Sequence, residues 1–333
     1  MKILDCTLRD GAHVNGGRFS TDVIESLNTA FGQAKIDFVE IGFLQYSSDV
    51  LATSFYSSVL EIENIVKKYG NKYSKYGFML RPDRCDINDL KASDELSFLR
   101  LAFYGEHFPL LESYIKKSQD LGYAISINPI GVSTLSKDAL KSIYEICNKF
   151  SVDTFSIVDT HGALKLNTFS NLIDFTLAEL NFDVDIGLHF HENLMFSQAL
   201  LSNALQRKNI KNRLIVDSSV SGMGRIPGNL ATEMLIDNFS DNFSDIKDSK
   251  KIYEVATTLM EKYYDACPWG YNYLYAKSAD LNINRSYPEF FIEKGISAKK
   301  TLELLSLISN TEEGDRFNFN FAETMMEENS IDK

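Results

Sequence analysis

The stretch Lys2–His13, KILDCTLRDGAH, decides between the two fold classes that the chain's pattern allows. KILDC (Lys2–Cys6) is typical of a short buried strand. It is followed by TLRDGAH, with Arg9 and Asp10 in the turn, whereas a doubly wound open sheet usually carries a glycine-rich phosphate turn after its first strand. Because this turn has no dinucleotide-binding fingerprint, the first unit favours a closed α/β barrel.

Working outward from this unit, seven more β-rich runs follow, and all but one are succeeded by a longer amphipathic stretch, since the helical pattern near Ile87–Lys91 is short and weak. Eight such units over about 240 residues match the usual size of a (β/α)8 TIM barrel. The expected strands are Lys2–Cys6, Phe38–Ile41, Tyr76–Leu80, Phe98–Ala102, Ala124–Ile130, Thr154–Val158, Asp185–Leu188 and Leu214–Asp217. The expected helices are Thr21–Ala34, Phe55–Tyr69, Ile87–Lys91, Phe108–Leu121, Lys137–Phe150, Thr168–Leu180, Met195–Arg207 and Asn229–Phe239.

The alternation of strand and helix ends near residue 245. Beyond it, Lys250–Tyr264, Ala298–Ile308 and Phe319–Glu327 have helical patterns. We therefore predict two parts, a barrel over residues 1–245 and a C-terminal helical extension over residues 246–333.

Composition excludes several function classes. The 333 residues include 46 acidic and 34 basic side chains, and the resulting net charge of −12 argues against nucleic acid or anionic lipid as a main partner. No apolar run reaches the 18 or so residues of a membrane span, and the polar start MKILDCTLRD does not resemble a signal peptide. Four cysteines without a C-x-x-C pair argue against a zinc knuckle and against a disulfide framework. The predicted location is the cytoplasm.

Polar side chains recur where the expected strands end, which is where a barrel of this type carries its active site. The pair His189 and His191 is the most specific signal, since residues two apart on a strand point to the same face. With one carboxylate, such as Asp10, the two imidazoles would form a facial set of three metal ligands. The other candidates at strand ends are Arg9, Glu40, Arg81, Asp83, Asn128, Asp159 and Thr160.

Three ordered motifs resemble the DRE-TIM metallolyase superfamily, and most of all its 4-hydroxy-2-oxovalerate aldolases. They are LDCTLRDGAH (Leu4–His13), HFHENL (His189–Leu194) and DSSVSGMGRIPGN (Asp217–Asn229). The likeness covers the barrel and, more loosely, the tail, where WGY (Trp269–Tyr271) matches a Gly-Tyr element.

The resemblance implies a divalent-metal aldolase that interconverts a 4-hydroxy-2-oxo acid with pyruvate and an aldehyde. Asp10, His189 and His191 would bind the metal, with Mn²⁺ expected and Mg²⁺, Co²⁺ or Zn²⁺ as alternatives. Arg9 would stabilise the enolate oxygen, and Glu40 would orient the Arg9 guanidinium.

Further roles are implied for residues around this centre. His13 would act as the general base on the 4-hydroxyl, because its unperturbed pKa lies near neutrality. Tyr271 would close the pocket, although aromatic packing is an equal interpretation. Thr160, Asn128 and Asn193 would contact or orient substrate, while Asn193 could instead cap the following helix.

The sequence departs from the aldolase pattern after the third strand, where MLRPD (Met79–Asp83) replaces aliphatic residues and Pro-Gly. Arg81 there indicates an acceptor aldehyde that is polar or anionic, unless it faces outward and pairs with Asp83. His161 also replaces a smaller residue and could intrude on the site.

Two alternatives stay open. One is an acyl-CoA lyase or a Claisen-type synthase of the same superfamily, but the lyases' cysteine is absent from GMGRIPGN (Gly222–Asn229), and the tail is short for a synthase's regulatory domain. The other is a barrel that serves as a non-catalytic partner subunit. The resemblance also implies a homodimer, and an aldehyde dehydrogenase as a channelling partner.

Overall fold

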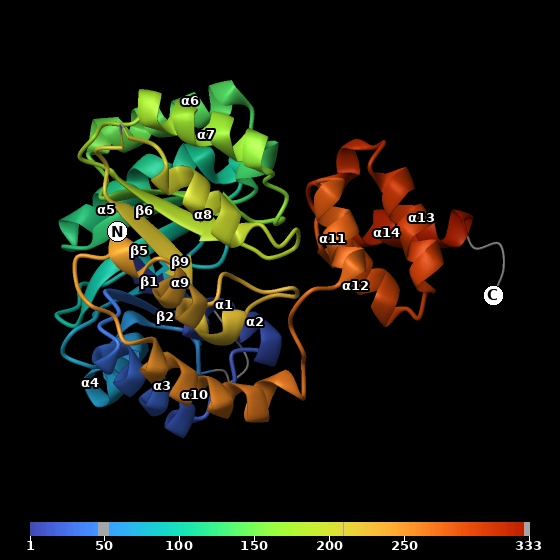
Figure 1. Cartoon of the computed structure of the whole chain (residues 1–333). Coiled ribbons are helices and arrows are strands. Elements are labelled where there is room, and N and C mark those ends of the chain that lie inside the picture. Colours follow the sequence, from blue (N-terminus) through green and yellow to red (C-terminus); the bar gives the residue numbers. More distant parts are fainter. Residues whose placement is uncertain (46–52, 209, 330–333) are drawn as a thin grey trace.

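The computed structural model describes residues 1–45, 53–208 and 210–329, and it contains the expected closed barrel (Figure 1). All neighbouring strands are parallel, and pairing of the first strand with both the second and the last closes the ring. In ring order the strands are β1 (Lys2–Asp5), β2 (Phe38–Leu44), β4 (Lys75–Leu80), β5 (Leu96–Phe103), β6 (Ala124–Pro129), β7 (Thr154–Asp159), β8 (Asp185–Phe190) and β9 (Leu214–Ser218).

The predicted (β/α)8 barrel with C-terminal helices is therefore confirmed. Helices cover the outside of the ring, and they are α3 (Thr21–Gln33), α4 (Val59–Tyr69), α5 (Leu111–Asp120), α6 (Lys137–Phe150), α7 (Leu166–Glu179), α8 (Ser197–Leu205) and α9 (Thr232–Asn238).

Three segments differ locally from the expected elements. The helix expected at Phe55–Tyr69 begins at Val59, because Ser58 caps it through the Glu61 amide, and Phe55–Tyr56 instead forms β3 beside β2. Ile87–Asp89 is only a 3₁₀ turn. The segment after β1 holds two four-residue helices, α1 (Thr7–Asp10) and α2 (Ala12–Asn15).

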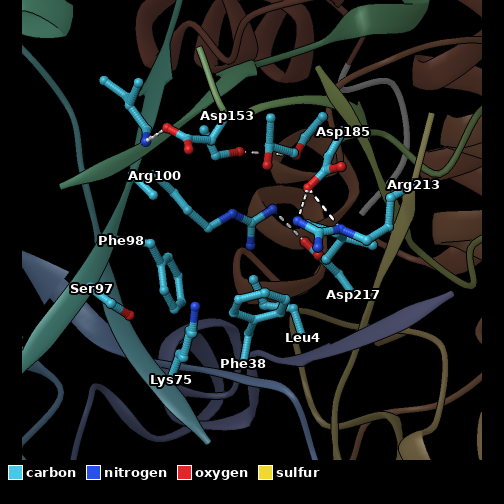
Figure 2. Close-up of a pocket in the computed structure, with 16 residues that line it drawn as sticks. Leu4, Phe38, Lys75, Ser97, Phe98, Arg100, Asp153, Asp185, Arg213 and Asp217 are labelled. Atoms are coloured by element: carbon cyan, nitrogen blue, oxygen red, sulfur yellow. Dashed lines mark hydrogen bonds and ion pairs between the residues drawn. The ribbon is translucent and has the colours of Figure 1, made fainter. Parts of the chain in front are cut away.

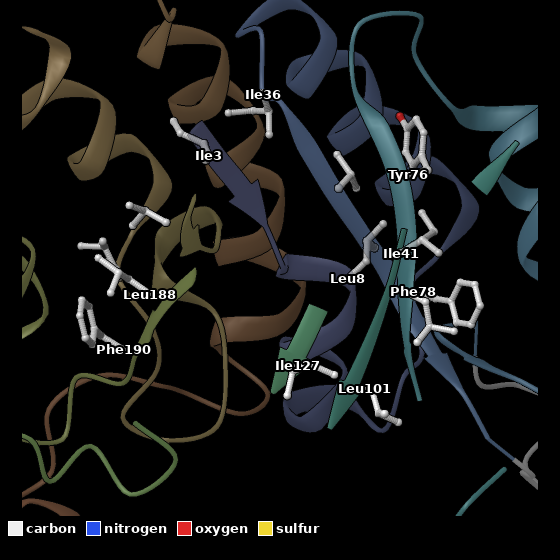
Figure 3. Packing of buried hydrophobic residues seen from close by; sticks show 14 of the residues in the cluster. Ile3, Leu8, Ile36, Ile41, Tyr76, Phe78, Leu101, Ile127, Leu188 and Phe190 are labelled. Carbon is white, nitrogen blue, oxygen red and sulfur yellow. The ribbon is translucent and has the colours of Figure 1, made fainter. Parts of the chain in front are cut away.

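Side chains alternate between the two faces of each strand. Outward residues such as Ile41, Leu101 and Leu188 pack under the helices in the main core, part of which Figure 3 shows. Inward residues fill the barrel in layers. The layer at the amino-terminal ends of the strands is apolar, with Leu4, Phe38, Phe98, Ala124 and Ile215.

The middle of the barrel interior is polar instead, since Glu40, Arg100 and Asp217 are joined there by buried ion pairs. Their side chains are almost completely excluded from solvent. The apolar layer below and the polar layer in the middle leave the carboxyl ends of the strands as the open end of the barrel.

The C-terminal helices divide by their packing. Helix α10 (Ser249–Leu259) lies against α3 and α9, and it buries Ile252, Val255 and Leu259 in the main core. The four helices that follow are α11 (Tyr273–Asp280), α12 (Ser286–Glu293), α13 (Ala298–Ile308) and α14 (Phe319–Glu328). Of these, α12, α13 and α14 share a separate apolar core around Tyr287 and Phe291, and α11 packs against α12 and α13.

We call α11–α14 the helical cap, because it contacts the loops at the carboxyl ends of the strands (Figure 1). Ser133 Oγ, after β6, donates to Asn282 Oδ1 at 3.0 Å, and Lys165 Nζ, after β7, lies 2.7 Å from Asp280 Oδ1. The division expected at residues 245/246 stays a prediction, although the packing places α10, just beyond it, with the barrel. Within the described residues, no helix is both long and apolar enough to cross a bilayer.

Candidate metal centre and active site

Asp10, His189 and His191 converge at the open end of the barrel, as the strand positions predict. One potential ligand atom from each lies within 4.8 Å of those of the other two. Asp10 ends α1, directly after β1, whereas the two histidines come from the end of β8. Asp10 and His189 are each only 3% exposed, so three donors meet in a site largely shielded from water.

The hydrogen bonds of both imidazoles suit metal binding. His189 Nδ1 lies 3.0 Å from Asp217 Oδ2, and His191 Nδ1 lies 2.8 Å from the carbonyl oxygen of Asp159. Both partners are acceptors, so Nδ1 donates in each ring, and Nε2 is the nitrogen left for a metal. Burial also lowers the pKa of His189, which favours the neutral form that a metal ligand needs.

The Asp10 carboxylate is also suited to metal binding. Burial disfavours its charged form, yet the Arg9 guanidinium and His191 hold the pKa of Asp10 well below its usual range. Asn229 Nδ2 donates to Asp10 Oδ2 at 2.5 Å, and Asn229 Oδ1 is buried without a hydrogen-bond partner. A Cβ at Gly224 would lie 3.0 Å from Asp10 Oδ2, so this loop approaches the carboxylate closely. A charged carboxylate, two neutral imidazoles and an unsatisfied oxygen fit a divalent cation.

Arg9 links this triad to the polar layer inside the barrel. Its Nε donates to Glu40 Oε2 and its Nη1 to Asp10 Oδ1, both at 2.7 Å. These two carboxylates raise the pKa of Arg9 despite its burial, so the guanidinium stays charged. Glu40 fixes the direction of the Arg9 side chain, in the geometry that the sequence analysis expected for it.

Arg100 holds the other side of the same layer, and the sequence analysis did not select it. Its Nη1 donates to Glu40 Oε2 at 3.0 Å and its Nη2 to Asp217 Oδ2 at 2.5 Å. Figure 2 shows Arg100 from a pocket at the opposite end of the barrel, where its guanidinium approaches Asp217. Through Asp217, Arg100 also supports the position of His189.

We expect Arg100→Met to lower the free energy of unfolding by about 3–5 kcal/mol, since Glu40 and Asp217 would keep buried charges with fewer partners. Arg213→Met is the matched control. The Arg213 side chain is 54% exposed and pairs with Asp185 at the rim, so its loss should cost no more than about 1 kcal/mol. Urea unfolding of both variants measures the difference, and equal effects would show that Arg100 is not a structural centre.

His13 is on α2. It lines the pocket at the open end of the barrel that Asp10, His189 and His191 also line. Its ring packs edge-on against Phe43, with centroids 5.4 Å apart. Nη2 of Arg225, from the loop after β9, lies 3.4 Å from both ring nitrogens. Burial, followed by the charge of Arg225, lowers the pKa of His13 well below its usual value, so the imidazole is neutral at pH 7.

Three predicted substrate contacts line this pocket, namely Arg81, Asn128 and Thr160. Arg81 lines the pocket and also pairs with Asp83 through two hydrogen bonds, so it does not face outward, and its contact with an acceptor aldehyde stays a prediction. With its amide oriented to satisfy its neighbours, Asn128 accepts from Arg100 Nη2 at 2.8 Å. The Thr160 hydroxyl oxygen accepts from the Gly131 amide at 2.8 Å, and its own proton remains free to donate.

Three other residues lie outside the pocket lining, contrary to the geometry expected for them. Asn193 Nδ2 reaches the carbonyl of Tyr275 in the helical cap at 3.4 Å, and it does not cap α8. His161 is buried against Asp315 of the cap, at 3.2 Å. Tyr271 is 62% exposed, because Trp269 takes the buried position in this segment and donates to the Ser221 carbonyl.

Sequence reasoning missed Arg100, Asp217, Asn229 and Arg225 as members of the site. A charged residue in the middle of the apolar strand FLRLA (Phe98–Ala102) was the available signal for Arg100, since a buried charge needs a partner. For the other three, the signal was their place in the loop motif of Asp217–Asn229.

Comparisons with known proteins show which family and which fold this chain resembles. Residues 104–258 match the HMGL-like family model. A 4-hydroxy-2-oxovalerate aldolase from Brevibacillus brevis is 25% identical over 241 residues, which cover 70% of this chain and 68% of the relative. An oxaloacetate decarboxylase from Mycobacterium tuberculosis is 24% identical over 236 residues, covering 70% of this chain and 68% of the relative.

Among solved structures, the N-terminal domain of a candidate aldolase from Bacteroides vulgatus superposes with a TM-score of 0.75. The two chains are 21% identical, and the match covers 91% of this chain and 99% of the other. Residues 104–258 therefore resemble an HMGL-like domain, and the chain as a whole has the fold of a TIM barrel with C-terminal helices.

Proposed function

We propose that the protein is a divalent-metal-dependent aldolase that interconverts a 4-hydroxy-2-oxo acid with pyruvate and an aldehyde. The observation that carries the proposal is the meeting of the Asp10–His189–His191 triad, Arg9 and a neutral His13 in one pocket. Names of relatives support the lyase class, and Mn²⁺ is the metal that we propose.

Different residues act on the two halves of the substrate during cleavage. A divalent cation held by the triad would supply Lewis-acid polarisation of the 2-oxo group. His13 takes the proton of the 4-hydroxyl, the bond between C3 and C4 breaks, and its electron pair passes to the pyruvate half as the enolate. The aldehyde leaves, and protonation of C3 gives pyruvate.

Arg9 and Thr160 would hold the pyruvate half. Arg9 is a charged donor beside the triad, and Glu40 holds it in place, so little reorganisation is needed when charge develops on the enolate oxygen. The Thr160 hydroxyl is oriented by the Gly131 amide and can donate to the pyruvyl carboxylate.

A coupled assay for pyruvate tests the proposal. The purified protein with Mn²⁺ should release pyruvate from at least one member of a panel of 4-hydroxy-2-oxo acids, including sugar-derived ones, and chelation should abolish the release. Release of pyruvate from oxaloacetate alone would move the assignment to a decarboxylase. Cleavage of an acyl-CoA substrate instead would move it to a lyase of the same superfamily.

The pH dependence of kcat/KM should reflect the protonation of His13. The base works as the neutral imidazole, so kcat/KM falls as pH drops through the His13 pKa, which lies below the usual 6.5. We expect the acidic limb below pH 6.5, and Arg225→Met should move it upward because a repelling charge is removed. Metal content measured across the same range separates this limb from loss of metal, and a limb above pH 7 in the unaltered protein would oppose the assignment.

A further inference from the structure

The outer part of the active-site pocket is basic, although the chain as a whole carries a net charge of −12. Among the described residues, the charged side chains that line the whole pocket are, apart from the histidines, five arginines and one carboxylate, Asp10, with no lysine. The arginines are Arg9, Arg81, Arg84, Arg100 and Arg225.

Depth separates these arginines into two groups. Arg9 and Arg100 lie deep, and their ion pairs with Asp10, Glu40 and Asp217 neutralise them. The other three arginines, Arg81, Arg84 and Arg225, lie further out and have fewer carboxylates beside them.

Among the outer three, Arg81 pairs with Asp83, and its guanidinium lies 4.9 Å from the ring centre of Tyr104. Arg84 Nη1 donates to the neutral amide oxygen of Gln45 at 2.9 Å, and no ion pair of Arg84 is found within the described chain. Within the described chain, Arg225 has no carboxylate at ion-pair distance, and His13 is its polar neighbour. The outer wall therefore holds more positive charge than its own carboxylates balance.

The surroundings of Arg225 make its unbalanced positive charge destabilising. Burial, followed by the charge of Arg285 in the helical cap, lowers the pKa of Arg225 to about 10. Arg285 pairs with Glu289, and its own Nε is buried without a partner. The charges of Arg225 and Arg285 repel each other, and an anion bound beside Arg225 would offset this repulsion and the loss of hydration.

The position of Arg225 shows which half of the substrate such an anion belongs to. The pyruvate half is assigned to the triad, Arg9 and Thr160, whereas His13 acts on the hydroxyl at C4. Arg225 lies 3.4 Å from the His13 ring nitrogens, so it faces the acceptor beyond C4.

We propose that Arg225, together with Arg81 and Arg84, forms a subsite for an anionic group on the acceptor aldehyde. The group is a carboxylate or a phosphate, both of which guanidinium groups bind through paired hydrogen bonds. This inference rests on the proposed aldolase function for the reaction, but the binding of the anion can be measured without it.

The kinetic test uses pairs of aldehydes that differ in charge, in aldol addition to pyruvate with Mn²⁺. Succinate semialdehyde is compared with butanal for the carboxylate, and glyceraldehyde 3-phosphate with glyceraldehyde for the phosphate. We expect kcat/KM to favour the anionic member of one pair by at least about tenfold, and Arg225→Met to lower this ratio by about 10- to 100-fold. Any change transmitted through His13 affects both members of a pair and cancels in the ratio.

Arg316→Met is the matched control. Arg316 also contacts Tyr104, at 4.8 Å, but it is 60% exposed, pairs with Glu106 and does not line the pocket. This variant should keep the charge preference. A preference for the neutral aldehydes, or a ratio that Arg225→Met leaves unchanged, would overturn the proposal.

A binding measurement separates the subsite from the reaction. Calorimetric titration of the metal-free protein with inorganic phosphate and with malonate should show binding of at least one anion, weakened about tenfold or more in Arg225→Met but not in Arg316→Met. If no aldehyde reacts but this pattern is found, the aldolase proposal fails and the anion subsite stands. Equal affinities in the unaltered protein and Arg225→Met refute the subsite.

Discussion

Asp10→Asn should lose its divalent metal and its activity together. The substitution keeps the shape of the side chain and removes the only carboxylate of the triad, leaving two neutral imidazoles beside a charged Arg9. Changes in residues that merely support ligands cost 10- to 100-fold in metal affinity, so loss of a charged ligand should cost more than about 100-fold. Mn²⁺ titration and pyruvate release measure the two effects.

Asp185→Asn provides the control for this experiment. Asp185 is a carboxylate of the same barrel at the opposite end, where it pairs with Arg213, and its replacement should leave metal binding and activity within about threefold. Retention of both metal and turnover in Asp10→Asn would show that the triad is not the metal site.

His13→Ala should separate chemistry from metal binding. A general base typically contributes 10²–10⁴-fold, so kcat/KM for cleavage should fall by about this factor, while Mn²⁺ affinity stays within about threefold. The distinction follows from the structure, because His13 touches Phe43 and Arg225 but is not a member of the triad.

His107→Ala is the matched histidine control. His107 lies in the 3₁₀ turn after β5, where its Nδ1 accepts from the Tyr104 amide, and it does not line the pocket. It should retain full activity. A fall of less than tenfold in His13→Ala, or equal loss in both variants, would remove His13 from the role of base.

The sequence predicted the barrel well because its signals were local and repeated. Each strand alternates inward and outward residues, and all but β4 are followed by a helix, so most of the eight units could be recognised one at a time. The triad followed from the same regularity, since His189 and His191 share a face of one strand and Asp10 ends another unit. Their burial and the proton positions on Nδ1 needed the three-dimensional structure.

The parts that sequence could not predict depend on long-range packing. Helices α11 and α12 have only eight residues each, too few for a clear amphipathic repeat, and they were not expected. Tyr271 was expected at the pocket, but Trp269 takes the buried position in that segment. Asn193 and His161 contact Tyr275 and Asp315 of the helical cap, which lie far from them in the sequence.

The central claim is metal-dependent formation of the pyruvate enolate in this pocket, and exchange of the pyruvate methyl protons for deuterium tests it most directly. The measurement needs no acceptor aldehyde. We predict that the protein with Mn²⁺ in D₂O incorporates deuterium into the methyl group, and that chelation of the metal or Asp10→Asn abolishes the exchange. Absence of exchange with every divalent metal tried, or exchange that persists unchanged after the metal is removed, would contradict the account.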